Sequence, residues 1–303
     1  KEQKNEEGGN ERIAMDERTE EELEKKLGNS KEPRTRSVFL AALQDRALAG
    51  DMPLADYVEY AMRLAEHEDN IRIQQQISSS IVTIVGLMQR LRPETDDALA
   101  ALLHRVETWS LRRTSNAMTD DQRQNWFNTF AGVVSTEAGL ERVTALLNGT
   151  VEIEGLLISP DIRWTLLLIL SRNGAADIDT LLATESASDG SDFGAKSLLA
   201  ANAALPNSAS KAKWLAELRN PEMLTGLSRQ RAVMGGLFPP NQTALQFELL
   251  DQVLDALPDL SETSDPYFMS SYSSVLLTPM CLPESGALMQ KILDELSANL
   301  ERR

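Results

Sequence analysis

Apolar residues recur at three- and four-residue spacing along most of the chain, as in Leu140, Val143, Leu146 and Leu147. This spacing places apolar side chains on one face of a helix. The chain is therefore expected to be a succession of helices with short joints. The predicted helical segments are 19–28, 36–50, 51–69, 70–91, 94–114, 119–134, 136–149, 159–174, 177–184, 192–205, 210–218, 228–237, 246–257, 265–277 and 285–296.

Residues that favour helix ends stand at many of these boundaries. Gly50 and Gly149 suit the left-handed cap that ends a helix. Thr119 and Gln122 have the spacing of a capping box, and Ser159 precedes Pro160 as an N-cap precedes a first-turn proline. The exception to the helical pattern is the alternating, β-branched segment 151–158, for which we expect a short extended connector.

Short joints between many helices favour antiparallel neighbours stacked in chain order. We therefore predict an all-α fold, an α-solenoid or right-handed superhelix of antiparallel helix pairs of the HEAT or armadillo type. No strict repeat of fixed length supports this, so the prediction rests on architecture alone. Residues 1–11 are polar and are expected to be a flexible lead-in, followed by one helical domain over residues 12–303. A curved stack has a concave face, which is where we expect function to reside.

Composition narrows the possible partners. The net charge of −16 repels nucleic acids and anionic membrane surfaces. No apolar run approaches the roughly 20 residues that span a bilayer, and we expect a cytoplasmic protein.

The single cysteine, Cys281, suits a reducing compartment, so the Asn-x-Thr sequons at Asn148 and Asn241 are interpreted as chance. The start without methionine suggests a fragment or an excised domain.

One short motif invites a metal-site hypothesis. His67 and Glu68 open the zinc-hydrolase signature H-E-x-x-H, in which histidines at i and i+4 bind zinc and the glutamate activates water. Here the i+4 position is Ile71, and the other histidine, His104, is far along the chain. We interpret both histidines as helix-surface residues and Cys281 as an incidental thiol. The sequence thus gives no catalytic residue and no metal ligand.

Other candidate motifs have structural explanations. The segment 190–197, GSDFGAKS, lacks the spacing of a phosphate loop, and 233–240, VMGGLFPP, is interpreted as a helix end. Packing between helices is the favoured role of the tryptophans. They are Trp109, Trp126, Trp164 and Trp214. The sequence pattern leaves the substrate-binding residues unknown.

The order of several segments resembles the C-terminal helical domain of the aminopeptidase N family. Gly155-Leu156 and Asp161-Ile162-Arg163-Trp164 match the family's Gly-Leu connector and the start of its next helix. The Lys-x-x-Trp helix of the family is matched by Lys211 and Trp214, whereas Gly236-Leu237-Phe238 departs from the family's Gly-Phe turn. The resemblance covers roughly residues 12–300, and it is closest to bacterial enzymes.

The resemblance implies zinc-dependent removal of N-terminal residues from peptides by a longer enzyme. It places zinc, its ligands and the catalytic groups in an upstream domain of the same polypeptide, so no cofactor is expected in this chain. The implied role of this part is to cap the active-site cleft and control access of peptide substrates. Arg163 and Arg231 are candidates to meet a substrate carboxylate, although Arg163 beside Trp164 could equally be a structural ion-pair partner. The alternative is a free-standing helical-repeat scaffold that binds a basic protein partner in its groove.

Overall fold

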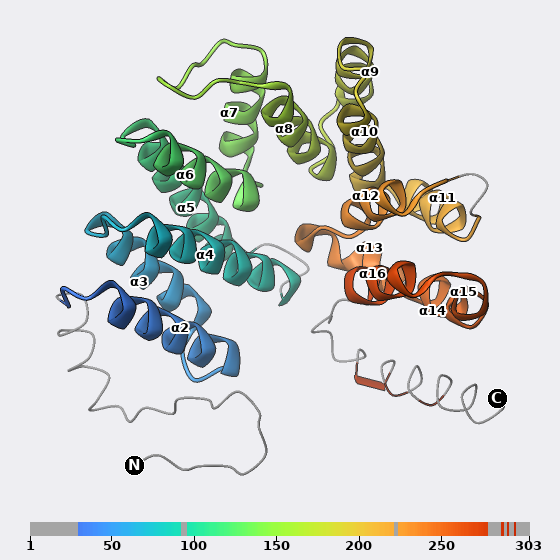
Figure 1. The fold of residues 1–303 in the computed structure, drawn as a ribbon, viewed down its shortest axis with the longest axis horizontal. Coiled ribbons are helices and arrows are strands. Elements are labelled where there is room, and N and C mark those ends of the chain that lie inside the picture. The colour runs from blue at the N-terminus through green and yellow to red at the C-terminus, as the bar shows by residue number, and fades with distance from the viewer. Residues whose placement is uncertain are drawn as a thin grey trace. The chain divides into compact units, whose positions relative to one another are not determined.

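The computed structural model describes residues 30–91, 96–220 and 224–277, together with 286–287, 290 and 294. Helices account for the regular structure in these residues, which contain no strand, so the predicted all-α class is confirmed (Figure 1). The expected lead-in, the predicted helix at 19–28, most of the predicted helix at 285–296 and Cys281 lie outside the described residues. Among the described helices, none has the length and apolar character that crossing a bilayer requires.

Two compact units make up the described chain. The first comprises residues up to Val85 with Trp109–Gly132, and the second comprises Gly86–Thr108 with residues from Val133 onward. The helices α4, α5 and α6 each contribute residues to both units. The first unit is built from α2 (Pro33–Ala49), α3 (Leu54–Glu66) and parts of α4 (Ile71–Leu91), α5 (Asp97–Ser115) and α6 (Asp120–Val133).

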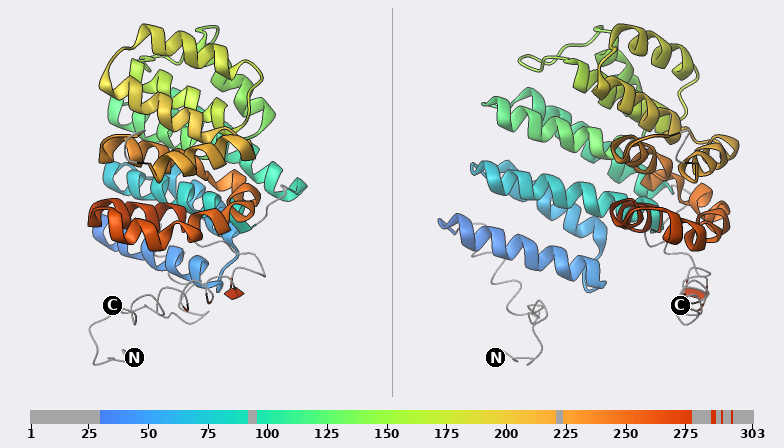
Figure 2. Two further views of the ribbon diagram at one scale, coloured as in Figure 1. Left: turned by 90° about the vertical axis from the view of Figure 1, so that its right-hand side faces the viewer. Right: turned by 45° about the vertical axis from the view of Figure 1, so that its right-hand side comes forward.

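The second unit stacks its helices in chain order. Within it α8 packs against α10, α10 against α12, and α12 against α16, and the left view of Figure 2 shows α10, α12 and α16 one below another. This nearest-neighbour packing is how helical-repeat proteins bury their cores. The helices that lie wholly in the second unit are α7 (Glu137–Leu147), α8 (Pro160–Arg172), α9 (Ile178–Ser188), α10 (Asp192–Ala204), α11 (Ser208–Leu218), α12 (Leu227–Leu237), the 3-10 turn η1 (Pro240–Gln242), α13 (Thr243–Glu248), α14 (Leu250–Asp255), α15 (Leu257–Thr263) and α16 (Pro266–Leu276).

Helix boundaries follow the capping residues that the sequence provides. Gly50 ends α2 with φ at 83°, a left-handed conformation that costs glycine little. The Ser159 hydroxyl accepts a hydrogen bond from the Ile162 amide at 3.4 Å, with Pro160 in the first turn of α8. Thr119 likewise accepts from the Gln122 amide at 3.2 Å before α6. These predicted helix ends are confirmed.

Two segments differ from a simple succession of long helices. The predicted helix at 246–257 is divided among α13, α14 and α15, with breaks at Leu249 and Ala256. Pro258 in the first turn of α15 has no N–H to continue the preceding helix. The connector 151–158 is non-helical, as predicted, but it turns back at Gly155, whose φ is 76°, and forms no strand.

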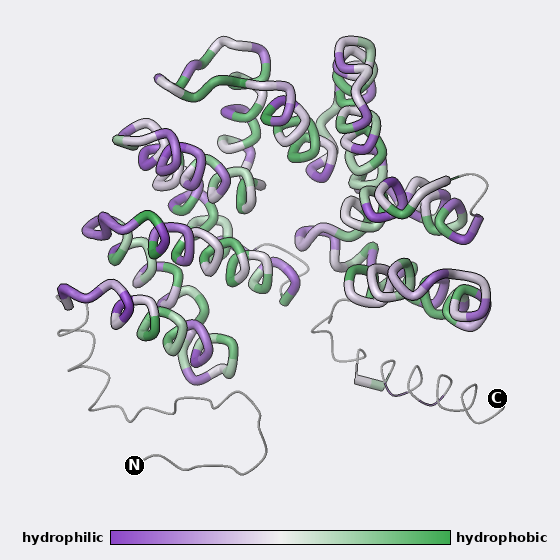
Figure 3. Tube along the Cα trace, in the orientation of Figure 1, coloured by the Kyte–Doolittle hydropathy of each residue, from purple (hydrophilic) through white to green (hydrophobic). Residues whose placement is uncertain are grey.

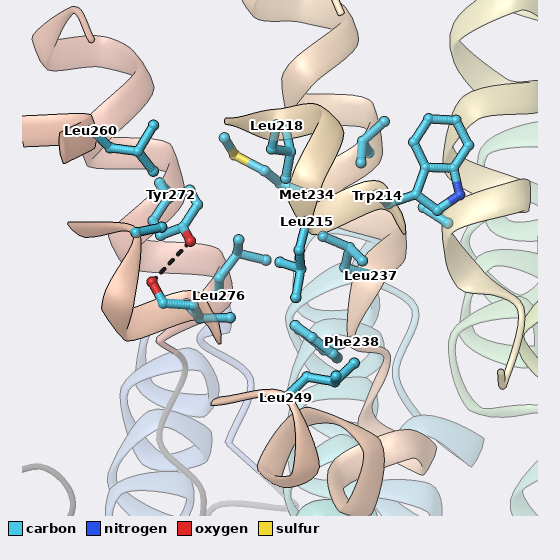
Figure 4. Packing of buried hydrophobic residues seen from close by; sticks show 14 of the residues in the cluster. Trp214, Leu215, Leu218, Met234, Leu237, Phe238, Leu249, Leu260, Tyr272 and Leu276 are labelled. Atoms are coloured by element: carbon cyan, nitrogen blue, oxygen red, sulfur yellow. Dashed lines mark hydrogen bonds between the residues drawn. The ribbon is translucent and has the colours of Figure 1, made fainter. Parts of the chain in front are cut away.

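The second unit has a continuous apolar core between α11, α12 and the later helices (Figure 4). Leu215 and Leu218 of α11 are buried with Met234 and Leu237 of α12 in one cluster. The Tyr272 hydroxyl donates a hydrogen bond to the Val253 carbonyl at 3.0 Å, and its burial raises the pKa of that hydroxyl. Figure 3 shows hydrophobic and hydrophilic positions alternating along these helices, as an amphipathic pattern requires.

Small residues allow two of these helices to approach closely. Gly236 of α12 lies against the backbone of Ala200 in α10: a Cβ at this glycine would meet the Ala200 carbonyl carbon at 3.0 Å and its Cα at 3.1 Å. The neighbouring Gly235 is exposed, with nothing within 4 Å of its Cβ position. The contact between α10 and α12 therefore depends on the absence of one side chain.

Candidate functional site

The truncated zinc signature lies at the joint between α3 and α4. His67 is the exposed C-cap residue of α3, in agreement with the surface interpretation. Glu68 is buried, and both of its carboxylate oxygens are engaged by Arg36, with Nε to Oε2 at 2.7 Å and Nη2 to Oε1 at 2.8 Å. The Asn70 amide also donates to this carboxylate at 2.8 Å. Since its oxygens are already bound and Ile71 supplies no ligand, this segment does not fit a zinc ion.

The bidentate pair has a structural role instead. Arg36 comes from the first turns of α2, and Glu68 follows α3, so the pair fastens two segments of the first unit. The hydrogen bond to Glu68 raises the pKa of the Arg36 guanidinium, against the opposing effect of burial. Planar two-point contacts of this kind fix geometry as well as charge.

The second histidine is also a surface residue. His104 lies exposed on α5. Across the part of the chain that the structure describes, no three side chains from His, Cys, Asp and Glu gather in a way that could hold a metal ion. The sequence-derived assignments of no catalytic residue and no metal ligand remain expectations.

The tryptophans are core residues, as predicted. Each of the four is buried. Trp109 and Trp126 pack edge to face in the first unit, with ring centroids 5.1 Å apart, a favoured aromatic geometry. Trp164 donates its indole N–H to Asp189 at 2.8 Å. Hydrogen bonds from Ser191, and then from Trp164, lower the pKa of this carboxyl group.

Arg163 is a structural ion-pair partner. Its Nε and Nη2 lie 2.8 Å and 2.6 Å from Oε2 of the buried Glu185 in α9. Its Nη1 donates to the Leu147 carbonyl at the end of α7, at 3.1 Å. One guanidinium thus connects α7, α8 and α9 through all three of its nitrogens. The structure therefore supports the ion-pair interpretation of Arg163.

Arg231 lies in a different environment. It is exposed on α12, and its Nε donates to the Ser271 hydroxyl of α16 at 2.8 Å. Among the described residues its two terminal nitrogens have no partner. Two further cations lie on α10 and α12: Lys196 and Arg229 pair with Asp192 of α10 at 2.8 Å and 3.7 Å. We call Lys196, Arg229 and Arg231 the α10–α12 cation surface.

This surface has the chemistry to bind a carboxylate. Two of its cations, Lys196 and Arg229, pair with Asp192, whose pKa is lowered first of all by its hydrogen bond to Lys196, whereas Arg231 contacts Ser271 instead. A guanidinium with free terminal nitrogens can take a carboxylate through two parallel hydrogen bonds. Of the two arginines that the sequence singled out, Arg231 is therefore the one whose geometry leaves it available.

Several buried charged groups were missed by sequence reasoning. Lys211 is fully buried in α11, where its ammonium donates to the Ala203 carbonyl at 2.7 Å, and desolvation lowers its pKa to about 7. The helical phase that Lys211 shares with the buried Trp214, Leu215 and Leu218 was the signal that could have revealed it.

A second buried charge caps a helix. Glu107 of α5 accepts hydrogen bonds from the Ser135 and Thr136 amides at 2.8 Å and 2.9 Å, just before α7. A carboxylate at this position satisfies free N–H groups and favours the positive end of the helix dipole. Desolvation lowers the pKa of Arg172 to about 10, opposed by the nearby Glu107 charge. No local pattern in the sequence links these distant residues.

A side-chain amide ties two helix ends together in the second unit. Gln242 of η1 is buried and donates its two N–H groups to the carbonyls of Arg172, at the end of α8, and Ala204, at the end of α10. The distances are 2.7 Å and 2.8 Å. Lys211 binds the adjacent Ala203 carbonyl, so the last two carbonyls of α10 are capped by later parts of the chain.

The connector 151–158 borders an open groove. The groove has a volume of about 770 Å³ and is lined by the end of α7, the connector and Arg163. Leu157 in the connector is 83% exposed. A second groove of about 640 Å³ lies along α7 and includes Asn148 and Asn173. Neither groove contains a residue set that points to a reaction.

Comparison with known proteins identifies the family. The family model described as "ERAP1-like C-terminal domain" matches residues 9–303. The chain is also 23% identical over 309 residues to a protein named Aminopeptidase N from Streptomyces lividans; the match covers 96% of the chain and 35% of that relative. The chain thus spans about a third of the length of this relative, and the resemblance stated from the sequence is confirmed. Because the family match extends over nearly the whole sequence, the chain belongs to the family of ERAP1-like C-terminal domains.

Proposed function

We propose that this chain is the helical C-terminal part of a zinc aminopeptidase, in which it covers the active-site cleft and limits which peptides reach it. The observation that carries the proposal is the family match over residues 9–303, together with a relative named Aminopeptidase N of which the chain spans 35%. In this proposal the zinc ion and the reacting groups belong to another part of the same polypeptide. The partners are that catalytic part and the peptide substrate.

Within this role, the α10–α12 cation surface is proposed to contact the peptide. Peptides carry a negative charge at their C-terminus, and the protein as a whole carries −16. An exposed arginine on such an acidic protein gives a carboxylate a specific place to bind, since the net negative charge of the protein repels it elsewhere. Arg231 is the residue proposed to form this contact, because its terminal nitrogens are unpaired among the described residues.

The test uses the longer polypeptide that contains this chain. We would measure kcat/KM for a small chromogenic aminoacyl substrate and for peptides of increasing length, each with a free or an amidated C-terminus. Arg231→Ala should raise KM for long peptides with a free carboxylate by about tenfold, the effect of losing one charge-assisted contact of roughly 1.5 kcal/mol. It should leave the small substrate unchanged, because that substrate does not extend beyond the catalytic part.

Arg142→Ala provides the matched control, since Arg142 is an exposed arginine of α7. It should change neither class of substrate. Equal effects of both variants on long peptides would remove the role of Arg231. Absence of zinc-dependent aminopeptidase activity in the longer polypeptide would contradict the proposed function and leave the partner-binding scaffold as the better explanation.

A further inference from the structure

We propose that Asn148 is a site of spontaneous covalent modification, at which the side-chain amide is converted to aspartate and isoaspartate. Asparagine followed by glycine is the dipeptide most prone to this reaction, because glycine leaves its own amide nitrogen sterically open. The sequence contains two such pairs, Asn148-Gly149 and Asn173-Gly174. The structure distinguishes them.

Asn148 is exposed at the C-cap of α7, and Gly149 is exposed behind it. Gly149 has φ of 75°, with nothing within 4 Å of its Cβ position. The side-chain nitrogen Nδ2 of Asn148 has no hydrogen-bond partner among the described residues, whereas its Oδ1 accepts from the Thr150 amide at 3.0 Å. The leaving group is therefore free, and a backbone N–H polarises the carbonyl that is attacked.

The reaction needs no group beyond water. The deprotonated amide nitrogen of Gly149 attacks Cγ of Asn148, a Cγ–N bond forms, and negative charge develops on Oδ1, where the Thr150 N–H can stabilise it. The Cγ–Nδ2 bond then breaks, and the NH2 group leaves as ammonia after taking up one proton, which balances the proton lost from the Gly149 amide. Addition of water to either carbonyl of the resulting succinimide gives aspartate or isoaspartate.

Only a local change in the backbone is needed for the Gly149 amide nitrogen to reach Cγ of Asn148. Asn148 has ψ of 0° as the helix C-cap, so the backbone must rotate before the ring can close. The Gly149 amide donates only one long hydrogen bond, to the Leu146 carbonyl at 3.3 Å. Helix ends fray readily, and residues 148–150 at this end of α7 are exposed, which makes this rotation accessible in the folded protein.

The second pair is held in place. Asn173 is half-buried, its Nδ2 donates to the Ile169 carbonyl at 2.8 Å, and its Oδ1 accepts from Asn241 at 3.0 Å. Gly174 lies against Pro206, whose Cγ would be 3.0 Å from a Cβ at that glycine. Rotation here breaks two side-chain hydrogen bonds and disturbs this contact, so the same dipeptide should react more slowly.

The modification changes the joint between α7 and the connector 151–158. Aspartate would add a negative charge beside the carbonyl end of α7, which the helix dipole disfavours. Isoaspartate would also insert an extra carbon into the backbone just before the connector. The product therefore differs from the original chain in charge and path at the border of both grooves.

The experiment is incubation of the folded chain at mildly alkaline pH, followed by peptide mapping with mass spectrometry and by isoaspartate-specific methyl labelling. Asn148 should be modified at least about tenfold faster than Asn173, a factor that one net hydrogen bond supplies. In denaturant, both sites should react at similar rates, which provides the internal control. The variant Asn148→Gln should lose the signal at this site and keep that at Asn173.

Three results would overturn the proposal. They are equal rates at the two sites in the folded chain, faster reaction at Asn173, and an unmodified Asn148 under conditions in which the denatured chain reacts. Gly149→Ala is a second variant that slows the attack by crowding the nitrogen. Because the left-handed φ of Gly149 disfavours alanine, the folding of this variant is checked by circular dichroism before rates are compared.

Discussion

Replacing Gly236 by alanine tests the close contact between α10 and α12. Inside a helix, glycine to alanine normally stabilises the fold by about 0.5–1 kcal/mol, because alanine loses less backbone freedom on folding. At Gly236 the added methyl group would overlap the Ala200 carbonyl oxygen and lie 3.0 Å and 3.1 Å from the Ala200 carbonyl carbon and Cα. Backbone atoms cannot rotate away as a side chain can, so the two helices must separate.

The expected magnitude follows from these two opposing terms. Overpacking a tight contact costs about 1–3 kcal/mol, and a backbone obstacle places this position near the upper limit. After subtraction of the gain in helix propensity, Gly236→Ala should lower the free energy of unfolding by about 2 kcal/mol. The adjacent Gly235 has nothing within 4 Å of its Cβ position, so Gly235→Ala should be neutral or stabilising by up to about 1 kcal/mol.

Urea unfolding followed by circular dichroism measures both variants, with hydrogen exchange in α10 and α12 to locate the change. The midpoint should fall for Gly236→Ala and stay unchanged or rise for Gly235→Ala, and exchange should accelerate in α10 and α12 for Gly236→Ala alone. Equal stability of the two variants, or a gain for Gly236→Ala, would refute the reasoning, because the neighbouring positions share the same helix and differ only in what the methyl group meets.

Three further changes test buried charges. The folded pKa of Lys211, about 7, lies below its unfolded value of 10.5, so the unfolded state binds more protons between these pH values and the native chain should become more stable as pH rises through them. Lys211→Met should abolish this gain in stability. A native chain whose stability is flat across that pH range contradicts this. Glu68→Gln should cost about 2 kcal/mol by removing the charged partner of Arg36, and added zinc should not restore the melting temperature. Gly139→Ala should destabilise α7 by about 1–2 kcal/mol because its Cβ would overlap the Glu107 carboxylate; a raised melting temperature would show that the carboxylate moves aside freely.

Local signals in the sequence predicted the helices well. Gly50, Thr119 and Ser159 act at helix ends through contacts within three residues, so sequence spacing alone identifies them. The division of the predicted helix at 246–257 was missed because buried leucines at three- and four-residue spacing fit one continuous helix as well as three short ones. Periodicity records which face is buried and not whether the backbone bends.

The chemistry of individual residues depended on partners far along the chain. Arg163 was open to two interpretations until Glu185, 22 residues away, was seen beside it. His67 and Glu68 matched the first half of a zinc motif, but the role of Glu68 is decided by Arg36 on another helix. The availability of Arg231 likewise depends on Ser271 of α16. Sequence spacing lists candidate groups, whereas tertiary contacts determine which of them remain free.

The capped end of α10 has a consequence for how the second unit comes apart. Lys211 and Gln242 occupy the Ala203 and Ala204 carbonyls, and Gln242 also holds the Arg172 carbonyl of α8. If either segment detached alone, buried carbonyls would lose their donors, at a cost of about 1–3 kcal/mol for each. Residues 160–242 should therefore exchange their slowest amide hydrogens together, as one cooperative block, and partial opening should begin outside it.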